Sequence, residues 1–295
     1  MSDTLESLQR KISGAGDLES VVRTMKVLAA SNILQYERAV SSLGDYYRTV
    51  ELGLVICFQR AGELTATEKQ WQTETEAIGA VVFGSDQGLV GQFNDALSEY
   101  TGNTLRNLPG GKRIWAVGER MQARLEDAGL PVAGLFPVPN SVNTITPVIG
   151  QILLESEAHR EKGEISQLYI FHNRPKPGAI YEPIVQRLLP LDEKWRSSVA
   201  QLKWPTDKIP EAMNGVEPTL HGLIRQYLFI SLFRACAESL ASENASRLAA
   251  MQRAEKNIDE LLEDLNRAFH RLRQSTIDEE LFDVISGSEA LSKGK

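Results

Sequence analysis

The chain has 295 residues, enough for two ordinary domains or for one domain with a long appendage. Its composition, 42% hydrophobic and 24% charged, is typical of a globular protein, and its net charge of −7 argues against a nucleic-acid-binding protein with a dominant basic face. The first residues, MSDTLESLQRK, lack the apolar core of a signal peptide, and no apolar run reaches the roughly 18 residues of a membrane span.

The first element in chain order is a long helix, expected over residues 2–58 within an N-terminal segment of residues 1–60. Gly14-Ala15-Gly16 interrupts it and is either a bend or a close contact. Further along, its apolar residues recur at alternating spacings of four and three, which is typical of a stripe covered by another helix. They are Tyr36, Val40, Leu43, Tyr47, Val50, Leu54 and Cys57.

After a polar linker at residues 61–76, strand-like and helix-like runs alternate over residues 77–203. The two prolines of residues 173–178 favour a turn, and the strand after that turn is expected at a sheet edge. This alternation predicts an open sheet flanked by helices. Strands are expected at 77–83, 113–117, 132–136, 165–172 and 179–191, and helices at 89–105, 119–128 and 144–159.

A proline-rich connection at residues 204–215 leads into a second long helix, 216–288, followed by a tail, 289–295. We expect this helix to stop near Ser286-Gly287-Ser288. Because one long helix begins the chain and another ends it, the two would return along each other. The predicted fold class is therefore α/β: a long antiparallel coiled coil of N- and C-terminal helices with an inserted Rossmann-like α/β domain. The second seam is Met251, Ala254, Ile258, Leu261, Leu265, Ala268 and Leu272.

Four blocks resemble the gamma subunit of F-type ATP synthases, the central rotor stalk. Val21–Asn32 (VVRTMKVLAASN) is similar to the family's ITKAMKMVAASK, and Gly84–Asn94 (GSDQGLVGQFN) is similar to SDRGLCGGFN. Ala241–Asn257 (ASENASRLAAMQRAEKN) and Phe269–Ser288 (FHRLRQSTIDEELFDVISGS) are similar to ASEQAARMxAMxxATDN and YNKARQASITxELxEIVSGA. The blocks keep their order, so the resemblance covers essentially the whole chain.

The departures from the family pattern are expected of a divergent branch, an alternative (N-type), sodium-linked ATPase. Asn32 stands where the family has Lys, His270 where it has Asn, Asp278 where it has Thr and Ser288 where it has Ala. In place of Ala-Thr-Asp-Asn the chain has Ala254-Glu255-Lys256-Asn257.

The resemblance implies a non-catalytic subunit that rotates and couples ion flow through the membrane c-ring to ATP synthesis or hydrolysis. The implied partners are the alpha and beta subunits of the catalytic hexamer, the epsilon subunit and the c-ring. It implies no cofactor, no metal, no nucleic acid and no membrane span of its own. The implied place is the cytoplasmic side of the cell membrane, where the complex holds the chain.

By the same resemblance, the stalk meets the catalytic subunits at two groups of residues. Met25 lies where the stalk passes an acidic lever segment; from the residues alone, Met is core filler and flanking cations form a solvated face. The second group would make transient contacts with a catalytic-subunit loop, and the apolar residues beyond Leu272 suit a tip inside a sleeve of other subunits. The two groups are Arg23, Met25 and Lys26, and Arg273, Gln274 and Glu280. The region around Ile180 to Leu191 is a candidate contact with the ring.

The motif GSDQGLVGQ follows a predicted strand, where phosphate-binding loops lie. Its glycines are spaced G-x3-G-x2-G and no Lys-Ser/Thr follows, so a structural turn built on Ser85, Asp86, Gly88 and Gly91 is favoured over a nucleotide site. Ser85, Asp86 and His172 lack the G-x-S-x-G elbow of a catalytic triad. The histidines show no metal-ligand spacing.

Two alternatives from other classes remain. One is a Rossmann-like nucleotide-binding enzyme with helical extensions, and the other is a coiled-coil adaptor or scaffold. Nucleotide binding by the isolated chain would favour the first, and a stable self-dimer would favour the second. Cys57 and Cys236, the only two cysteines, are expected to be buried free thiols in a reducing compartment.

Overall fold

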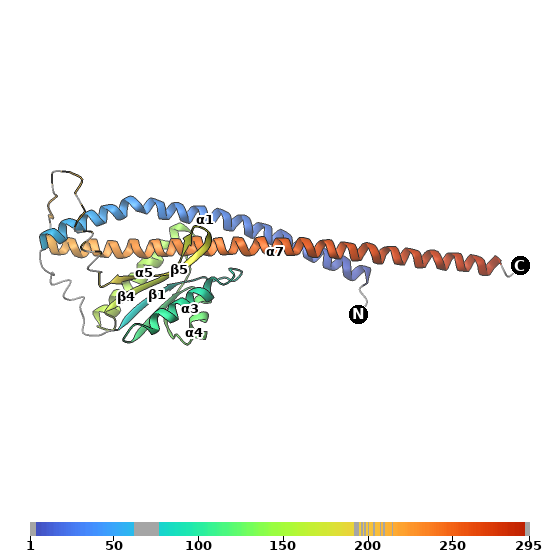
Figure 1. The fold of residues 1–295 in the computed structure, drawn as a ribbon, viewed down its shortest axis with the longest axis horizontal. Helices are drawn as coiled ribbons and strands as arrows, with labels where there is room; N and C mark the ends of the chain where they lie inside the picture. The colour runs from blue at the N-terminus through green and yellow to red at the C-terminus, as the bar shows by residue number, and fades with distance from the viewer. Residues whose placement is uncertain are drawn as a thin grey trace. The chain divides into compact units, whose positions relative to one another are not determined.

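The computed structural model describes residues 4–61, 77–191 and 215–292, with scattered positions between 195 and 213. Residues 62–76 of the predicted linker, several positions of the predicted connection 204–215 and the end of the predicted tail lie outside the described residues. The residues form two compact units, one of Met1–Leu28 with Leu248–Lys295 and one of Ala29–Arg247. The long helices α1 (Leu5–Ala61) and α7 (Val216–Ser292) each contribute to both units (Figure 1).

Within the larger unit, α1 and α7 pair antiparallel, as predicted. The Asn32 side-chain amide donates to Asn244 Oδ1 at 3.3 Å, and the Tyr46 hydroxyl donates to Gln226 Oε1 at 2.8 Å. Residue numbers therefore rise along one helix as they fall along the other. All seven residues of the predicted first seam are buried or half-buried.

In the smaller unit the second seam was predicted with one error. Met251 is buried and Ile258 and Leu265 are half-buried, but Leu261 is 48% exposed and Leu262 is half-buried in its place. An α-helix has about 3.6 residues per turn, so a strict alternation of three and four drifts off the facing helix. A second consecutive step of four, from Ile258 to Leu262, corrects that drift.

The five-stranded sheet of the larger unit has the order β3-β2-β1-β4-β5. Neighbours among the first four strands pair parallel, and β5 pairs antiparallel with β4 at the edge, as predicted. The strands are β1 (Ile78–Phe83), β2 (Lys112–Val117), β3 (Val132–Phe136), β4 (Gln167–Lys176) and β5 (Ala179–Leu189).

Helices cover both faces of this sheet (Figure 1). Alternate residues of β1 separate the two cores: Ile78, Ala80 and Val82 join one cluster, while Val81 and Phe83 join the other. The first cluster lies under α3 (Phe93–Arg106) and α4 (Glu119–Asp127), and the second under α5 (Val142–Glu161), α1 and α7. A strand covered on both sides reads as a continuous apolar run, which is why β1 was recognisable in the sequence.

Strand β4 continues through the residues predicted as a turn. The pairing with β5 skips Pro175, which has no N–H to give the ladder, and resumes at Lys176. Arg174 and Lys176 both reach Glu182 across the hairpin, at 2.5 and 2.8 Å. The turn itself is confined to residues 177 and 178.

Two helix ends also differ from expectation. Helix α3 begins at Phe93 and not at Leu89, because Leu89 and Gly91 have φ of 62° and 58° and cannot be helical. Helix α7 passes Ser286-Gly287-Ser288 and ends at Ser292, since a glycine inside a helix costs only about 1 kcal/mol relative to alanine.

Small features of α1 and α7 follow the sequence. Helix α1 is continuous through Gly14-Ala15-Gly16. Ala15 is buried, but a Cβ added to Gly14 or Gly16 would meet nothing of the described residues within 4 Å, so no close approach requires these two glycines. Cys57 and Cys236 are buried free cysteines, as expected. Across the described ranges, no helix is both long and apolar enough to cross a bilayer.

Candidate functional site

The motif GSDQGLVG forms a clamp at the carboxyl ends of the parallel strands. Ser85 is fully buried; its N–H donates to Asn94 Oδ1 at 3.1 Å, and its hydroxyl accepts from the Asn94 amide at 2.8 Å. The Asp86 carboxylate accepts the backbone N–H of Glu119 at 2.9 Å and that of Val138 at 3.1 Å. Asp86 thereby joins the segments that follow β1, β2 and β3.

The Asp86 contact with Glu119 occupies one helix start of the domain. Glu119 is the first residue of α4, and the N-terminus of a helix is a position that favours anions. The chain fills that position with its own carboxylate.

Two close approaches fix this turn. A Cβ added to Gly84 would lie 2.3 Å from Met121 Cβ, and one added to Gly118, whose φ is +107°, would lie 2.6 Å from the Ser85 carbonyl oxygen. Gly88, in contrast, has open space around it. The glycines of the motif are therefore not equivalent, and Gly84 is the one required by packing.

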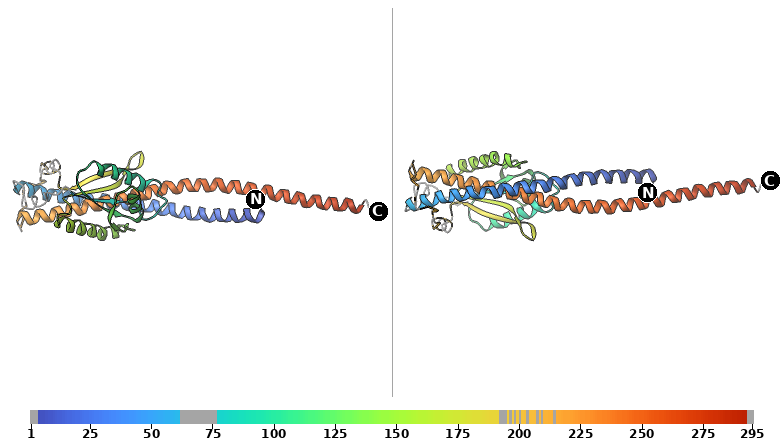
Figure 2. Two further views of the ribbon diagram at one scale, coloured as in Figure 1. Left: turned by 90° about the horizontal axis from the view of Figure 1, so that it is seen from below. Right: turned by 90° about the horizontal axis from the view of Figure 1, so that it is seen from above.

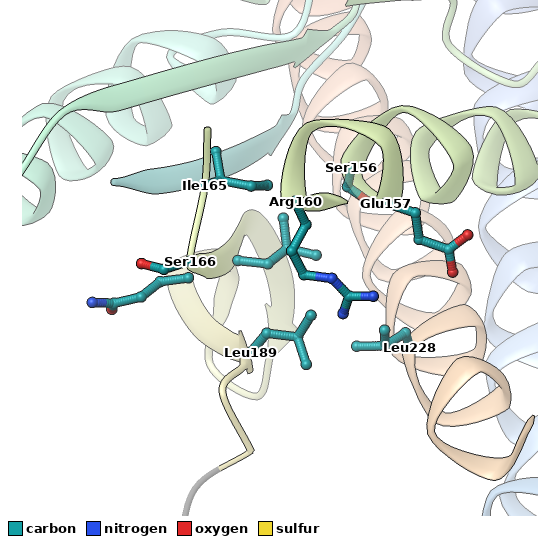
Figure 3. Close-up of a pocket in the computed structure, with 9 residues that line it drawn as sticks. Ser156, Glu157, Arg160, Ile165, Ser166, Leu189 and Leu228 are labelled. Atoms are coloured by element: carbon teal, nitrogen blue, oxygen red, sulfur yellow. The ribbon is translucent and has the colours of Figure 1, made fainter. Parts of the chain in front are cut away.

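Two pockets of the larger unit lie beside the residues described above. A polar pocket of about 230 Å³ next to Asp86 is also lined by Glu243 and by Arg247, which pairs with it. The pocket between α5, β4 and α7, where Arg160 lies over Leu189 and Leu228, has a volume of only about 10 Å³, the size of one water molecule (Figure 3). Within the described ranges, no group of three His, Cys, Asp or Glu side chains could hold a metal ion.

A row of serines on α7 binds the ends of the sheet and of the clamp. The Ser239 hydroxyl donates to the Phe83 carbonyl at 3.1 Å, that of Ser242 to the Asn173 carbonyl at 3.0 Å, and that of Ser246 to the Val90 carbonyl at 2.6 Å. Sequence reasoning missed this serine row. Its signal is the spacing of three and four, which places three small donors on one helix face.

A buried ion pair lies beside the serine row. Arg247 donates to Glu243 Oε1 at 2.6 Å, and the two side chains are only 12% and 7% exposed. Burial raises the pKa of Glu243, and the neighbouring guanidinium opposes that change. The pair tolerates burial because each charge neutralises the other.

His172 is also tied to α7 and not to a triad. Its Nε2 lies 2.9 Å from Glu238 Oε2, and Glu238 Oε1 accepts from Arg234 at 2.7 Å. Burial lowers the pKa of His172, with the Glu238 bond opposing. Since the bonds of Ser85 go to Asn94 and Gln87, the imagined triad is not assembled.

The first predicted contact group lies on α1 in the smaller unit. Met25 is half-buried, and the cation on each side of it has an internal partner. Arg23 pairs with Glu19 one turn earlier, and Lys26 Nζ lies 2.6 Å from Glu255 Oε2 on α7.

The second predicted contact group is exposed on α7. Arg273, Gln274 and Glu280 make no hydrogen bond or ion pair with the part of the chain that the structure describes. In this unit α7 extends past the N-terminal end of α1, so its last described residues have no helix of α1 beside them (Figure 2). Its large apolar residues there are exposed: Ile277, Leu281, Phe282, Val284 and Ile285.

Comparisons with known proteins identify the family. A family profile described as ATP synthase matches residues 4–291. The ATP synthase gamma chains of Syntrophus aciditrophicus and Dechloromonas aromatica are 28% and 26% identical to this chain, over 98% and 97% of it and 99% of each relative. The chain belongs to the gamma-subunit family of ATP synthases. The resemblance stated from the four sequence blocks is thereby confirmed.

Solved structures show that this gamma chain shares the family's fold. A chain of the Euglena gracilis mitochondrial ATP synthase (OSCP/F1/c-ring) aligns with a TM-score of 0.64 at 17% identity, covering 99% of this chain and 95% of that one. A central stalk/c-ring structure from Tetrahymena thermophila aligns with a TM-score of 0.53 at 20% identity, covering 79% and 99%. The predicted fold class is confirmed, and the chain is a central-stalk subunit of an ATP synthase.

Proposed function

We propose that this gamma chain is the rotating shaft that couples ion flow through a membrane c-ring to ATP synthesis or hydrolysis, and that it carries no catalytic residue. The exposed apolar end of α7 is the observation that carries the proposal. Five large apolar side chains on an unpaired helix need cover from outside the chain. A sleeve formed by other subunits supplies that cover and still lets the helix turn.

The α/β domain supports a non-catalytic role. Asp86 occupies the start of α4, and in the pocket beside it the Glu243 carboxylate is already paired with Arg247. The domain would therefore serve as a rigid foot on the ring, with the segment from Ile180 to Leu191 as its contact. The relatives' structures contain F1 and c-ring components, which supports alpha, beta, epsilon and c-ring partners for this chain. Held by them, it would lie at the cytoplasmic side of the cell membrane.

Rotation would act through asymmetry. A single shaft within a ring of repeated subunits presents a different side to each catalytic site. Turning it changes which site meets which contact, so each site passes in turn through states of different nucleotide affinity.

Met25 would pass the acidic lever segment of the catalytic subunits. An uncharged, flexible side chain slides past moving carboxylates without forming a fixed ion pair. Met25→Lys is expected to form such a pair and uncouple ATP hydrolysis from ion pumping. The ratio of pumping to hydrolysis in membrane vesicles measures this, and an unchanged ratio would contradict the placement of Met25.

Arg273, Gln274 and Glu280 would form an electrostatic catch with a catalytic-subunit loop. All three are exposed and free of internal bonds within the described ranges, so they are available to a partner. Exposed ion pairs are worth roughly 0–1 kcal/mol, so the contacts would break at every step of rotation.

The departures from the family motifs support a finer proposal, that the complex is an alternative, sodium-linked ATPase. The two relatives reported above are only 28% and 26% identical, which fits a divergent branch. Sodium stimulation of ATP hydrolysis by the assembled complex tests this. Proton pumping without any sodium effect would remove it.

The test of the proposed function is purification from the native host with an affinity tag at Met1. Catalytic ATPase subunits and a ring proteolipid in fixed ratio are the expected result. Recovery of a free chain would overturn the proposal. Nucleotide binding by that free chain would then favour the enzyme alternative, and a discrete self-dimer the adaptor alternative.

A further inference from the structure

An ion pair crosses between the two helices of the smaller unit at the level of Met25. Lys26 Nζ on α1 lies 2.6 Å from Glu255 Oε2 on α7. The side chains are 32% and 22% exposed, so the pair is partly shielded from water. The ion pairs Arg23–Glu19, Lys256–Glu260 and Arg267–Asp264 of these segments each join residues of one helix.

Glu255 is also one of the departures from the family motif. The blocks around Met25 have Lys at position 26 in both this chain and the family, whereas position 255 is Thr in the family motif and Glu here. Compared with that motif, this chain has a carboxylate at position 255 in place of a hydroxyl, and Lys256 in place of the family's Asp. The Glu255 carboxylate lies within hydrogen-bond distance of Lys26.

The charges around Met25 are consequently neutralised from within the chain. Arg23 has Glu19, and Lys26 has Glu255. Met25, which lies between Arg23 and Lys26 in the sequence, is half-buried. A partner that passes this turn of α1 meets a thioether without a free cation beside it.

We propose that Glu255 is a positioning residue: it holds Lys26 against α7 and keeps that charge away from the acidic segment that Met25 passes. The inference rests on the proposed function, since it assigns the residue that sets the charge at the contact. The role lies in where the ammonium points and not in stability, because a pair with this much exposure stabilises the fold only slightly.

The test compares three variants in the assembled complex. Glu255→Thr, which restores the family residue, is expected to free Lys26 and lower the ratio of ion pumping to ATP hydrolysis, in the direction of Met25→Lys but by less. Glu260→Gln is the matched control, because it removes the same charge from the exposed Lys256 pair on the same helix. Its ratio should equal that of the unmodified complex.

A rescue experiment tests whether Glu255→Thr acts by freeing the Lys26 ammonium or only by removing the glutamate. Adding Lys26→Gln to Glu255→Thr removes the freed cation and should restore the ratio. Unchanged coupling in Glu255→Thr, or no recovery in the double variant, would overturn the proposal. Pumping is followed with a pH-sensitive dye and with labelled sodium, so the assay holds for either ion.

A second measurement does not depend on the complex. In a double-mutant cycle of Lys26→Gln and Glu255→Gln in the full-length chain, we expect the pair to change the folded-to-unfolded ratio by about two- to five-fold beyond additivity. Additive effects would overturn the inference whatever the pumping assay gives. Failure of the tagged chain to recover ATPase subunits would instead overturn the proposed function.

Discussion

The two halves of α7 use their side chains in opposite ways. In the proximal half, residues 216–247, serines are buried as well as apolar residues. Ser239, Ser242 and Ser246 each donate a hydrogen bond to a backbone carbonyl of the sheet or its clamp. In the distal half, residues 248–292, Phe282 is 70% exposed and other large apolar residues are exposed with it. Burial on this helix therefore follows the neighbours that each half has within the chain and not the polarity of its residues.

This difference separates what the chain needs for folding from what it offers to partners. The proximal half is part of the core that the sheet, α1 and α5 share. In the distal half the seam from Met251 to Leu272, with Leu262 in place of Leu261, is buried or half-buried, but the large apolar residues beyond Leu272 are exposed. In the proposed function other subunits cover them. Changes in the proximal half should therefore alter the stability of the isolated chain, and changes of the exposed apolar residues beyond Leu272 should alter only the complex.

The largest effect is expected where a buried charge loses its partner. Arg247→Gln leaves the Glu243 carboxylate buried and unpaired, which should lower the free energy of unfolding by about 3–5 kcal/mol. The distal counterpart is Lys256→Gln, whose pair is 78% and 65% exposed and should change stability by less than about 0.5 kcal/mol. Urea unfolding of the full-length chain measures both, and equal losses would break the comparison.

The second-largest loss of unfolding free energy is expected when a core side chain is truncated. Leu232→Ala empties a fully buried position of the proximal half and should cost about 2–5 kcal/mol of unfolding free energy. Phe282→Ala removes a larger side chain from the distal half, yet it should leave the unfolding midpoint of the isolated chain almost unchanged. A loss above about 1 kcal/mol for Phe282→Ala would mean that the distal end already has an internal partner.

The serine row should give a smaller effect. Ser242→Ala leaves the buried Asn173 carbonyl without its donor, at an expected cost of about 1–3 kcal/mol. Ser275→Ala, an exposed serine of the distal half, is the matched control and should lie within about 0.5 kcal/mol of the parent chain. A neutral Ser242→Ala would show that the row contributes no net stability.

The smallest effect concerns pH. Because burial lowers the pKa of His172, the unfolded chain takes up a proton that the native chain does not as pH falls below about 6.5. Stability should therefore fall with acidification from that pH, by at most about 1.4 kcal/mol per pH unit. Glu238, Arg234 and Arg174 face this histidine, and both guanidiniums stay charged throughout this pH range. A wild-type slope in His172→Gln would therefore show that His172 does not carry the effect.

The sequence predicts those elements whose signal is local and repeated. Strand β1 was recognisable from an unbroken apolar run, and the long helices from their spacing. The exchange of Leu261 for Leu262 was not predictable, because both are leucines and only the path of the facing helix selects one. The extension of β4 past Pro175 depends likewise on the partner strand, which skips that residue.

Prediction of the site was limited for a similar reason. The turn motif was recognisable as structural from its glycine spacing, but the two backbone N–H donors to Asp86 lie 33 and 52 residues away in sequence. Nothing local to Asp86 indicates them. The same holds for the hydrogen bond between Lys26 and Glu255, which are 229 residues apart in sequence. Only the antiparallel pairing of the two helices brings them together.

The carboxylate of Asp86 at the start of α4 has a consequence for the working cell. Many enzymes close a loop or domain when their substrate binds, so their conformation depends on whether the site is occupied. Here the position is permanently occupied by a side chain of the same molecule. In the proposed function, this part of the α/β domain would therefore keep one conformation, and the domain would transmit the same twist when ATP is scarce as when it is plentiful.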